Sequence, residues 1–166
     1  YAAGSFDTPL TESGRKQALA ARSVVEALRP SPTIIVHSNL SRAKDTAKIV
    51  NETLRLPMLE RDAIAEQCFG DWMGRPWPHI HERIVAGETP PNGESLAMLT
   101  ARVMAGLDEI LTLPNQPILI VAHGGLALGG EYPDHFAREL LDADVFAKPA
   151  DTRFAAKEFT PHRFAD

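Results

Sequence analysis

Two apolar runs of the sequence each end in residues that could bind an anion. The first, "TIIVHS" (33–38), is followed closely by Arg42, and the second, "PILIVAHGG" (117–125), ends in His123 and Gly124 with one more glycine. An arginine guanidinium is a planar fork that matches the oxygens of a phosphate or carboxylate group. A glycine has no side chain, so its backbone N–H can approach the same anion. These residue types predict a phosphate-binding pocket formed by Arg42, His123 and Gly124.

Each member of this predicted pocket also has a structural interpretation. Arg42 could be a solvated helix residue, and His123 could be a hydrogen-bonded histidine of the core. The glycine pair could be a turn. A cation in the first turn of a helix is unfavourable unless an anion lies beside it, because the helix dipole already favours negative charge there. The joint arrangement therefore favours the pocket.

Glu66 is a further candidate for chemistry. It lies in "AEQCFGDWMG" (65–74), where aromatic residues follow a carboxyl group. Apolar surroundings disfavour the charged form of a carboxyl group, and a general acid must keep its proton near neutral pH. The stretch therefore predicts a proton donor. The other interpretation is an exposed glutamate in a loop.

Hydrophobic periodicity indicates which elements position these residues. The two apolar runs are short and rich in β-branched residues, as strands buried on both faces are. Apolar residues at helical spacing predict three long helices and one short helix. By residue number, we expect helices at 10–30, 41–56, 77–86 and 93–113, a loop at 57–78, and two further strands at 140–147 and 153–159.

The alternation of strands and helices predicts an α/β fold, specifically a three-layer α/β/α sandwich with a mostly parallel sheet. In such sheets, ligands bind beyond the carboxyl ends of the strands. If the two apolar strands are neighbours, Arg42 and His123 lie at the same edge of the sheet.

Composition narrows the classes of function. The 166 residues are 44% hydrophobic and 23% charged, which is ordinary for a globular protein, and we expect a single domain over residues 1–166. The net charge of −5 gives no indication of a nucleic-acid or membrane surface. The single cysteine, Cys68, excludes an intramolecular disulfide and a cysteine-rich zinc site. No apolar run reaches the length of a membrane span and no signal peptide is evident, so we expect a cytoplasmic protein.

Five stretches, in this order, resemble motifs of the histidine phosphatase superfamily, also called the phosphoglycerate mutase-like family. They are "DTPLTESGRKQA" (7–18), "HSNLSRAKDTA" (37–47), "EQCFGDWMG" (66–74), "PNGES" (91–95) and "VAHGG" (121–125). Members of this family act through a covalent phosphohistidine. The resemblance implies a metal-independent phosphomonoesterase that needs no cofactor and acts on a small phosphorylated substrate. The resemblance does not decide whether the protein is a monomer or a homodimer.

The resemblance also implies a role for each candidate residue. Arg42 would clamp the phosphate, and His123 would donate a hydrogen bond to a non-bridging oxygen. Gly124 would contribute its backbone N–H. Glu66 would protonate the leaving oxygen and later activate water.

The sequence departs from the family at its nucleophile. The nucleophilic histidine of the family lies in an Arg-His-Gly motif at the end of a first strand, and the 166 residues contain no such motif. We expect that strand and its histidine to precede Tyr1 in the full-length protein. Residues 126–139 are also short for the crossover that follows "VAHGG" in the family, so we expect further residues there. The alternative is a natural family member that binds phosphate ligands without catalysis.

Two other functions compete with a phosphatase. Phosphoglycerate mutase-type phosphoryl transfer is disfavoured because the segment between Glu66 and Pro91 is shorter than the insertion usual in mutases of the family. A nucleotide-binding α/β domain is disfavoured because the sequence has no glycine-rich first βα turn and no Walker lysine. The aromatic residues Phe69, Trp72 and Trp77 could face the substrate or pack in the core.

Overall fold

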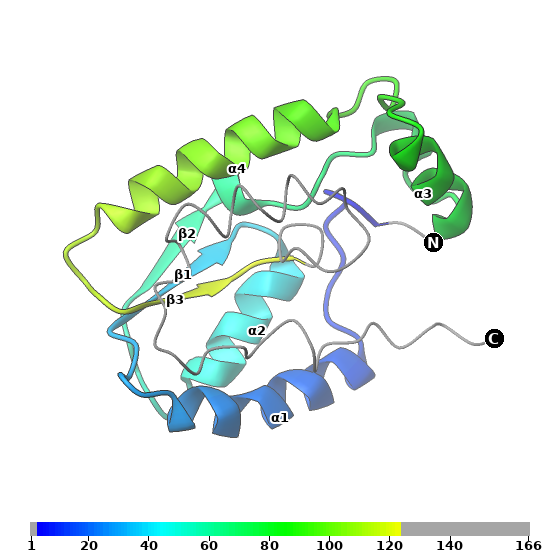
Figure 1. Ribbon diagram of the computed structural model, residues 1–166. Helices are drawn as coiled ribbons and strands as arrows, with labels where there is room; N and C mark the ends of the chain where they lie inside the picture. The colour runs from blue at the N-terminus through cyan, green and yellow to red at the C-terminus, as the bar shows by residue number, and fades with distance from the viewer. Residues whose placement is uncertain (1–2, 124–166) are drawn as a thin grey trace.

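The computed structural model describes residues 3–123, and a parallel sheet lies at its centre (Figure 1). The strands are β1 (Ile34–Ser38), β2 (Met58–Arg61) and β3 (Ile118–Val121). Their order is β2-β1-β3, and β1 pairs in parallel with both neighbours. The strands expected at 140–147 and 153–159 lie outside the described residues, as does Gly124.

Helices cover both faces of the sheet. They are α1 (Glu12–Ala27), α2 (Ser41–Asn51), α3 (Trp77–Val85) and α4 (Leu96–Leu111). Figure 1 shows α4 on one side of the sheet and α1 with α2 on the other. This arrangement confirms the predicted α/β fold with a parallel sheet. No helix within residues 3–123 is both long enough and apolar enough to cross a membrane.

The burial of β1 follows from its position between two helical layers. Every residue of this strand is buried, as its continuous apolar sequence predicts. Successive side chains point to opposite faces, so Val36 packs with Leu99 and Val103 of α4, whereas Ile35 packs with Val50 of α2. The two cores fix the strand, and with it the position of the polar residues at its carboxyl end.

The prediction of a loop over 57–78 is wrong in part. Met58–Arg61 form β2, which pairs with β1 in the register Val36 with Leu59 and His37 with Glu60. β2 is short and contains no β-branched residue. Most of its residues are only half-buried, because β2 lies at the edge of the described sheet. Pairing with β1, rather than local propensity, forms this strand. Two short 3-10 helices follow it, Asp62–Ile64 and Gly70–Trp72.

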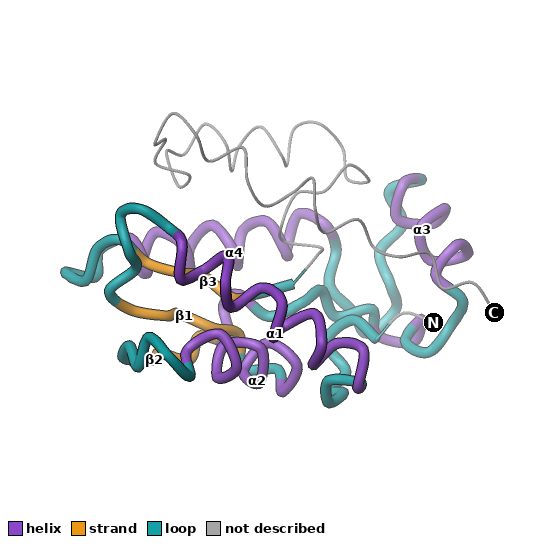
Figure 2. The backbone as a smooth tube through the Cα atoms, turned by 90° about the horizontal axis from the view of Figure 1, so that it is seen from below, coloured by secondary structure: helices purple, strands orange, loops and turns teal. Residues whose placement is uncertain are grey.

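A second hydrophobic cluster lies under α3, which stands apart from the sheet at one end of the molecule (Figure 2). Phe69 and Trp72 are 3% and 2% exposed and pack with Ile80 and Ile84 of that helix. The ring of Trp77 lies 5.9 Å from that of Phe69. Of the two interpretations of these aromatic residues, the structure supports core packing.

Candidate functional site

The site lies at the carboxyl end of β1, where the chain turns into α2. Leu40 is the N-cap residue of α2, and its apolar side chain cannot accept a hydrogen bond from the first N–H groups of the helix. Asp7, which comes from the segment before α1, takes this role: its Oδ1 accepts a hydrogen bond from the backbone N–H of Ser41 at 2.7 Å, and its Oδ2 accepts one from Ser41 Oγ at 2.7 Å. These hydrogen bonds hold the pKa of Asp7 below its usual value. The segment before α1 is therefore attached to the start of α2.

Arg42 strengthens this attachment. It lies in the first turn of α2, and its Nη1 donates to the carbonyl oxygen of Phe6 at 3.0 Å while Nη2 donates to that of Gly4 at 2.7 Å. Burial lowers the pKa of Arg42, and the carboxylates of Glu66 and Asp7 oppose that effect. An arginine nevertheless stays charged at neutral pH. Because each Nη carries two N–H bonds, the guanidinium can hold these carbonyl groups and an anion together.

His123 follows β3 and lies, like Arg42, at the carboxyl end of the strands. It is 8% exposed, and its Nε2 lies 2.8 Å from Ser38 Oγ, at the end of β1. Burial lowers the pKa of His123 to about 4, and the positive charges of Arg42 and Arg102 act in the same direction. The ring is therefore neutral at pH 7, with one N–H that can donate a hydrogen bond. The structure places Arg42 and His123 together, as the strand pattern predicts.

Glu66 lies between the two 3-10 helices and is half-buried. Its Oε1 accepts a hydrogen bond from the backbone N–H of Gln67 at 3.0 Å. It also interacts electrostatically with Arg42 and with Arg102 of α4. Arg42, Glu66, Arg102 and His123 thus form one electrostatic cluster, drawn from α2, the segment after β2, α4 and the end of β3.

The surroundings of Glu66 differ from the aromatic ones that the sequence predicted. A pocket of about 350 Å³ lies beside it, lined by charged and polar residues together with Ala65, Gly93 and Met98. The charged and polar residues include Ser5, Asp62, Cys68, Asn92, Glu94 and Arg102. The neighbouring aromatic residues Phe69 and Trp72 point instead into the cluster under α3. Glu66 therefore lies among charged groups rather than in the aromatic surroundings that the sequence predicted.

The two loops that contribute Cys68 and Asn92 to the lining of this pocket are in close contact with each other. The backbone N–H of Asp71 donates to the carbonyl oxygen of Pro91 at 2.9 Å. Gly70 has a φ of +46°, and a Cβ atom there would lie 2.1 Å from that same oxygen. A side chain at position 70 is therefore excluded both by the backbone conformation and by the neighbouring loop.

Sequence reasoning missed four residues of the site. Ser38 and Asp7 make no contribution to hydrophobic periodicity, although both lie in stretches that resemble family motifs. Glu94 lies in the quoted "PNGES" and was given no role. Arg102 lies within the strongly apolar helix, where only its polarity among apolar neighbours could have indicated a function.

Neither the described histidines nor the described carboxylates gather into a metal site: among residues 3–123, no three or more His, Cys, Asp or Glu side chains could hold one ion. The positive charge of the site is provided by arginine.

Comparison with known proteins places the chain in a family. The model of the histidine phosphatase superfamily (branch 1) matches residues 2–128. The chain is 42% identical over 122 residues to an uncharacterized phosphatase, PhoE, of Bacillus subtilis, a match that covers 73% of this chain and 62% of PhoE. It is 35% identical over 139 residues to the probable phosphoglycerate mutase GpmB of Yersinia pestis, covering 76% of this chain and 62% of GpmB.

The fold agrees with a solved relative. The complex of mycobacterial glucosyl-3-phosphoglycerate phosphatase with inorganic phosphate matches with a TM-score of 0.67 and 31% identity, over 87% of this chain and 76% of the other. The chain belongs to the histidine phosphatase superfamily. It spans 62% of the length of each of the two curated relatives.

Proposed function

We propose that this protein is a metal-independent phosphomonoesterase that hydrolyses a small phosphorylated substrate through a phosphohistidine intermediate. The observation that carries the proposal is the electrostatic cluster of Arg42, Glu66 and His123 at the carboxyl edge of the parallel sheet. It combines a fixed positive charge, a carboxyl group and a neutral imidazole in one place. Together with a histidine nucleophile, these are the groups that phosphoryl transfer without a metal ion requires.

Each group has a defined part in the reaction. The guanidinium of Arg42 binds phosphoryl oxygens, and the neutral ring of His123 donates its N–H to a non-bridging oxygen. In the first step, a histidine nitrogen forms a bond to phosphorus, the ester P–O bond breaks, and Glu66 gives its proton to the leaving oxygen. In the second step, Glu66 takes a proton from water, which attacks phosphorus and breaks the N–P bond. We propose that Gly124 adds its backbone N–H to the phosphate contacts.

The nucleophile is the histidine of the Arg-His-Gly motif that the family resemblance implies. The 166 residues contain no such motif. Tests of turnover therefore use the protein expressed from its complete gene, with its intact mass measured first. A mass that leaves room for the motif is expected; a mass matching these 166 residues would favour the second candidate function, phosphate binding without turnover.

The pocket beside Glu66 offers a small substrate both polar groups and apolar surface. Its lining provides hydroxyl, amide and carboxyl groups for hydrogen bonds to the leaving alcohol. The named relatives include phosphatases, and one solved relative binds inorganic phosphate. Phosphoglycerate mutase-type transfer remains the alternative enzyme, because one relative is named a probable mutase. Release of inorganic phosphate, measured against transfer to a second phosphoglycerate, distinguishes the two.

The experiment that tests the proposal is Glu66→Gln with a series of phosphate esters. Glutamine cannot donate a proton, so hydrolysis of alkyl esters, whose leaving groups need one, should slow by about 100-fold or more. Dinitrophenyl phosphate, whose leaving group departs as an anion, should be affected much less. Glu88→Gln serves as a control, since Glu88 is exposed and pairs with Arg83 on α3. Equal slowing across all esters would remove Glu66 from the role of acid.

A further inference from the structure

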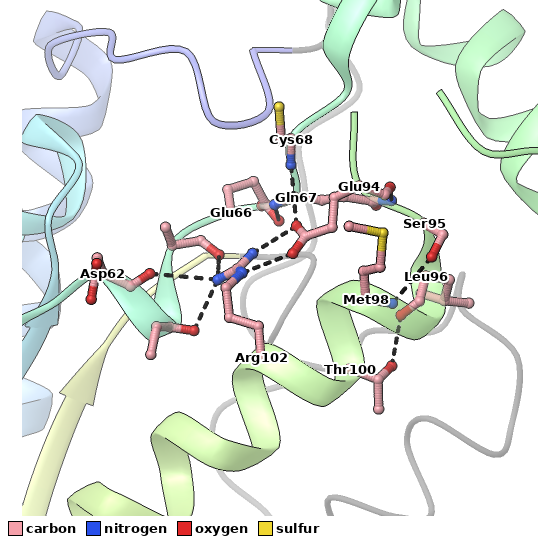
Figure 3. A network of polar contacts seen from close by, with 12 residues as sticks. Asp62, Glu66, Gln67, Cys68, Glu94, Ser95, Leu96, Met98, Thr100 and Arg102 are labelled. Atoms are coloured by element: carbon pink, nitrogen blue, oxygen red, sulfur yellow. Dashed lines mark hydrogen bonds and ion pairs between the residues drawn. The ribbon is translucent and has the colours of Figure 1, made fainter. Parts of the chain in front are cut away.

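Arg102 of α4 joins Glu94 to the segment that carries Glu66 (Figure 3). Its Nε donates to Glu94 Oε1 and its Nη2 to Glu94 Oε2, both at 2.8 Å. Its remaining nitrogen, Nη1, donates to the carbonyl oxygens of Ala63 and Ala65 at 2.9 and 3.0 Å. One guanidinium therefore binds a carboxylate with its fork and holds the backbone immediately before Glu66.

Glu94 holds the same segment from the other side. Its backbone carbonyl accepts a hydrogen bond from Gln67 Nε2 at 2.9 Å, and its backbone N–H donates to the carbonyl oxygen of Cys68 at 2.8 Å. Glu66 thus lies between a part of the chain fixed by Arg102 and a part fixed by Glu94. Its own carboxylate accepts from the N–H of Gln67, one of the residues so fixed.

The pair is also placed to control charge. The side chain of Glu94 is 12% exposed and that of Arg102 is 29% exposed, so water screens this ion pair little. The charged groups around Glu66 are Arg42 from α2, Arg102 from α4, and Glu94 and Asp62, which line the same pocket. Because Glu94 binds Arg102 bidentately, it offsets the positive charge that Arg102 would otherwise direct at Glu66.

We infer that Glu94 and Arg102 are a positioning pair for Glu66, which fixes the direction of its carboxyl group and balances the charge beside it for the proton transfer to the leaving oxygen. This inference rests on the proposed function, in which Glu66 is the acid. Neither member of the pair needs to touch the substrate. A purely structural role would be to attach α4 to the loop, and the two roles differ in what happens when one charge of the pair is removed.

The test compares single-charge removals in the protein expressed from its complete gene. Glu94→Gln leaves the charge of Arg102 uncompensated beside Glu66, which stabilises the carboxylate. The basic limb of the pH profile of kcat/KM should then move to lower pH by about one unit. Arg102→Met leaves Glu94 uncompensated, and the limb should move to higher pH. The double variant should return toward the wild-type limb with a lower kcat.

Two further variants separate position from charge. Arg102→Lys keeps the charge but cannot reproduce the fork and the carbonyl contacts, so kcat should fall while the limb stays. Glu88→Gln removes a carboxylate from a different ion pair, the one with Arg83, and should leave kcat and the basic limb of the pH profile unchanged. Melting temperatures of all variants show which of them are folded.

The titration of Glu66 can also be followed directly, by NMR of ¹³C-labelled glutamate carboxyl groups. Opposite displacements of its titration in Glu94→Gln and Arg102→Met would support the pair whether or not an ester is hydrolysed. Displacements in one direction, or none, together with lower melting temperatures would show a structural attachment only and overturn the inference. Failure of the wild type to hydrolyse any ester would instead overturn the proposed function.

Discussion

Arg42 holds backbone carbonyl groups with the same guanidinium that we propose binds phosphate. The carbonyls of Gly4 and Phe6 accept from its two Nη atoms, so its head group is fixed before any ligand arrives. A prearranged fork loses little side-chain entropy when an anion binds. Arg42 therefore holds the segment before α1 in place, and its head group is prearranged for the phosphate binding that we propose.

Replacement of Arg42 should weaken the binding of phosphate and vanadate. Loss of charge-assisted hydrogen bonds in Arg42→Ala should reduce affinity by about 10- to 100-fold. The affinity of Arg42→Lys should lie between those of the wild type and Arg42→Ala, because lysine keeps the positive charge but not the planar fork of the guanidinium. Isothermal titration with each anion measures the effect, and Arg22→Ala, which also removes an arginine-to-carbonyl bond, is the control. Unchanged affinity in Arg42→Ala would remove this residue from the site.

For single residues, the sequence predicted where the candidate residues of the site lie better than it predicted which side chains surround them. Arg42 and His123 follow buried strands, and parallel pairing brought them to one edge. The partners of these residues come from distant segments: Asp7 reaches Ser41, and Arg102 acts on Glu66. No periodicity within one element specifies such contacts, so the charged groups near Glu66 could not be predicted from its neighbours in the sequence.

The start of α2 is the element on which the site depends most. Its N-terminal N–H groups need acceptors, and Leu40 provides none with its side chain. Asp7 supplies both oxygens from a segment that precedes another helix. This segment is therefore attached to α2 twice, through the hydrogen bonds that Asp7 accepts from Ser41 and through those that Arg42 donates to the backbone carbonyl groups of the segment.

Removal of the cap should therefore affect stability and binding together. Asp7→Ala should lower the free energy of unfolding, as the loss of other N-caps does. It should also reduce phosphate affinity, because the segment held by Arg42 loses its second attachment. Urea denaturation and anion titration measure these effects. Thr11→Ala, which removes the cap of α1, should cost similar stability and leave phosphate affinity unchanged, and equal loss of affinity in both variants would contradict the argument.

Among the elements, the sequence predicted the helices and the strands β1 and β3, and it missed β2. The helices and β1 have an apolar pattern strong enough to fix their type, as Leu99, Val103 and Ile110 of α4 show by packing into one core. The strand Met58–Arg61 has no such pattern, and it forms because β1 presents an edge to it. The order of the strands is a property of the whole chain and follows from no single segment.

For the molecule as a whole, the proposed chemistry depends on arginine rather than on a metal ion. Hydrolysis by the protein expressed from its complete gene should therefore continue in the presence of EDTA, at a rate within the error of the untreated enzyme. Rates with and without the chelator, and after dialysis, measure this. Loss of activity that returns on addition of a divalent cation would indicate a metal-dependent phosphatase instead.

The stability of the whole molecule should depend on pH through His123. Its pKa is about 4 in the folded protein and 6.5 when unperturbed, because burial disfavours the charged ring. Between these values the unfolded state binds more protons than the folded state, so stability must fall as pH decreases from 6.5 to 4. A difference of this size corresponds to about 3 kcal/mol at most. Asp7, whose pKa is lowered from 3.8, affects stability below this window.

His123→Gln removes the titrating ring and keeps a group that can bond to Ser38. The free energy of unfolding in urea, measured from pH 7 to pH 4, should then decrease less steeply than in the wild type. His79→Gln is the matched control, because His79 is exposed on α3 and should leave the dependence unchanged. If His123→Gln and the wild type lose stability equally over this window, the ring of His123 is not held neutral by burial. Its pKa would then lie near the unperturbed 6.5, so the ring would gain its proton just below neutral pH, and its proposed role as a donor kept neutral by burial would fall.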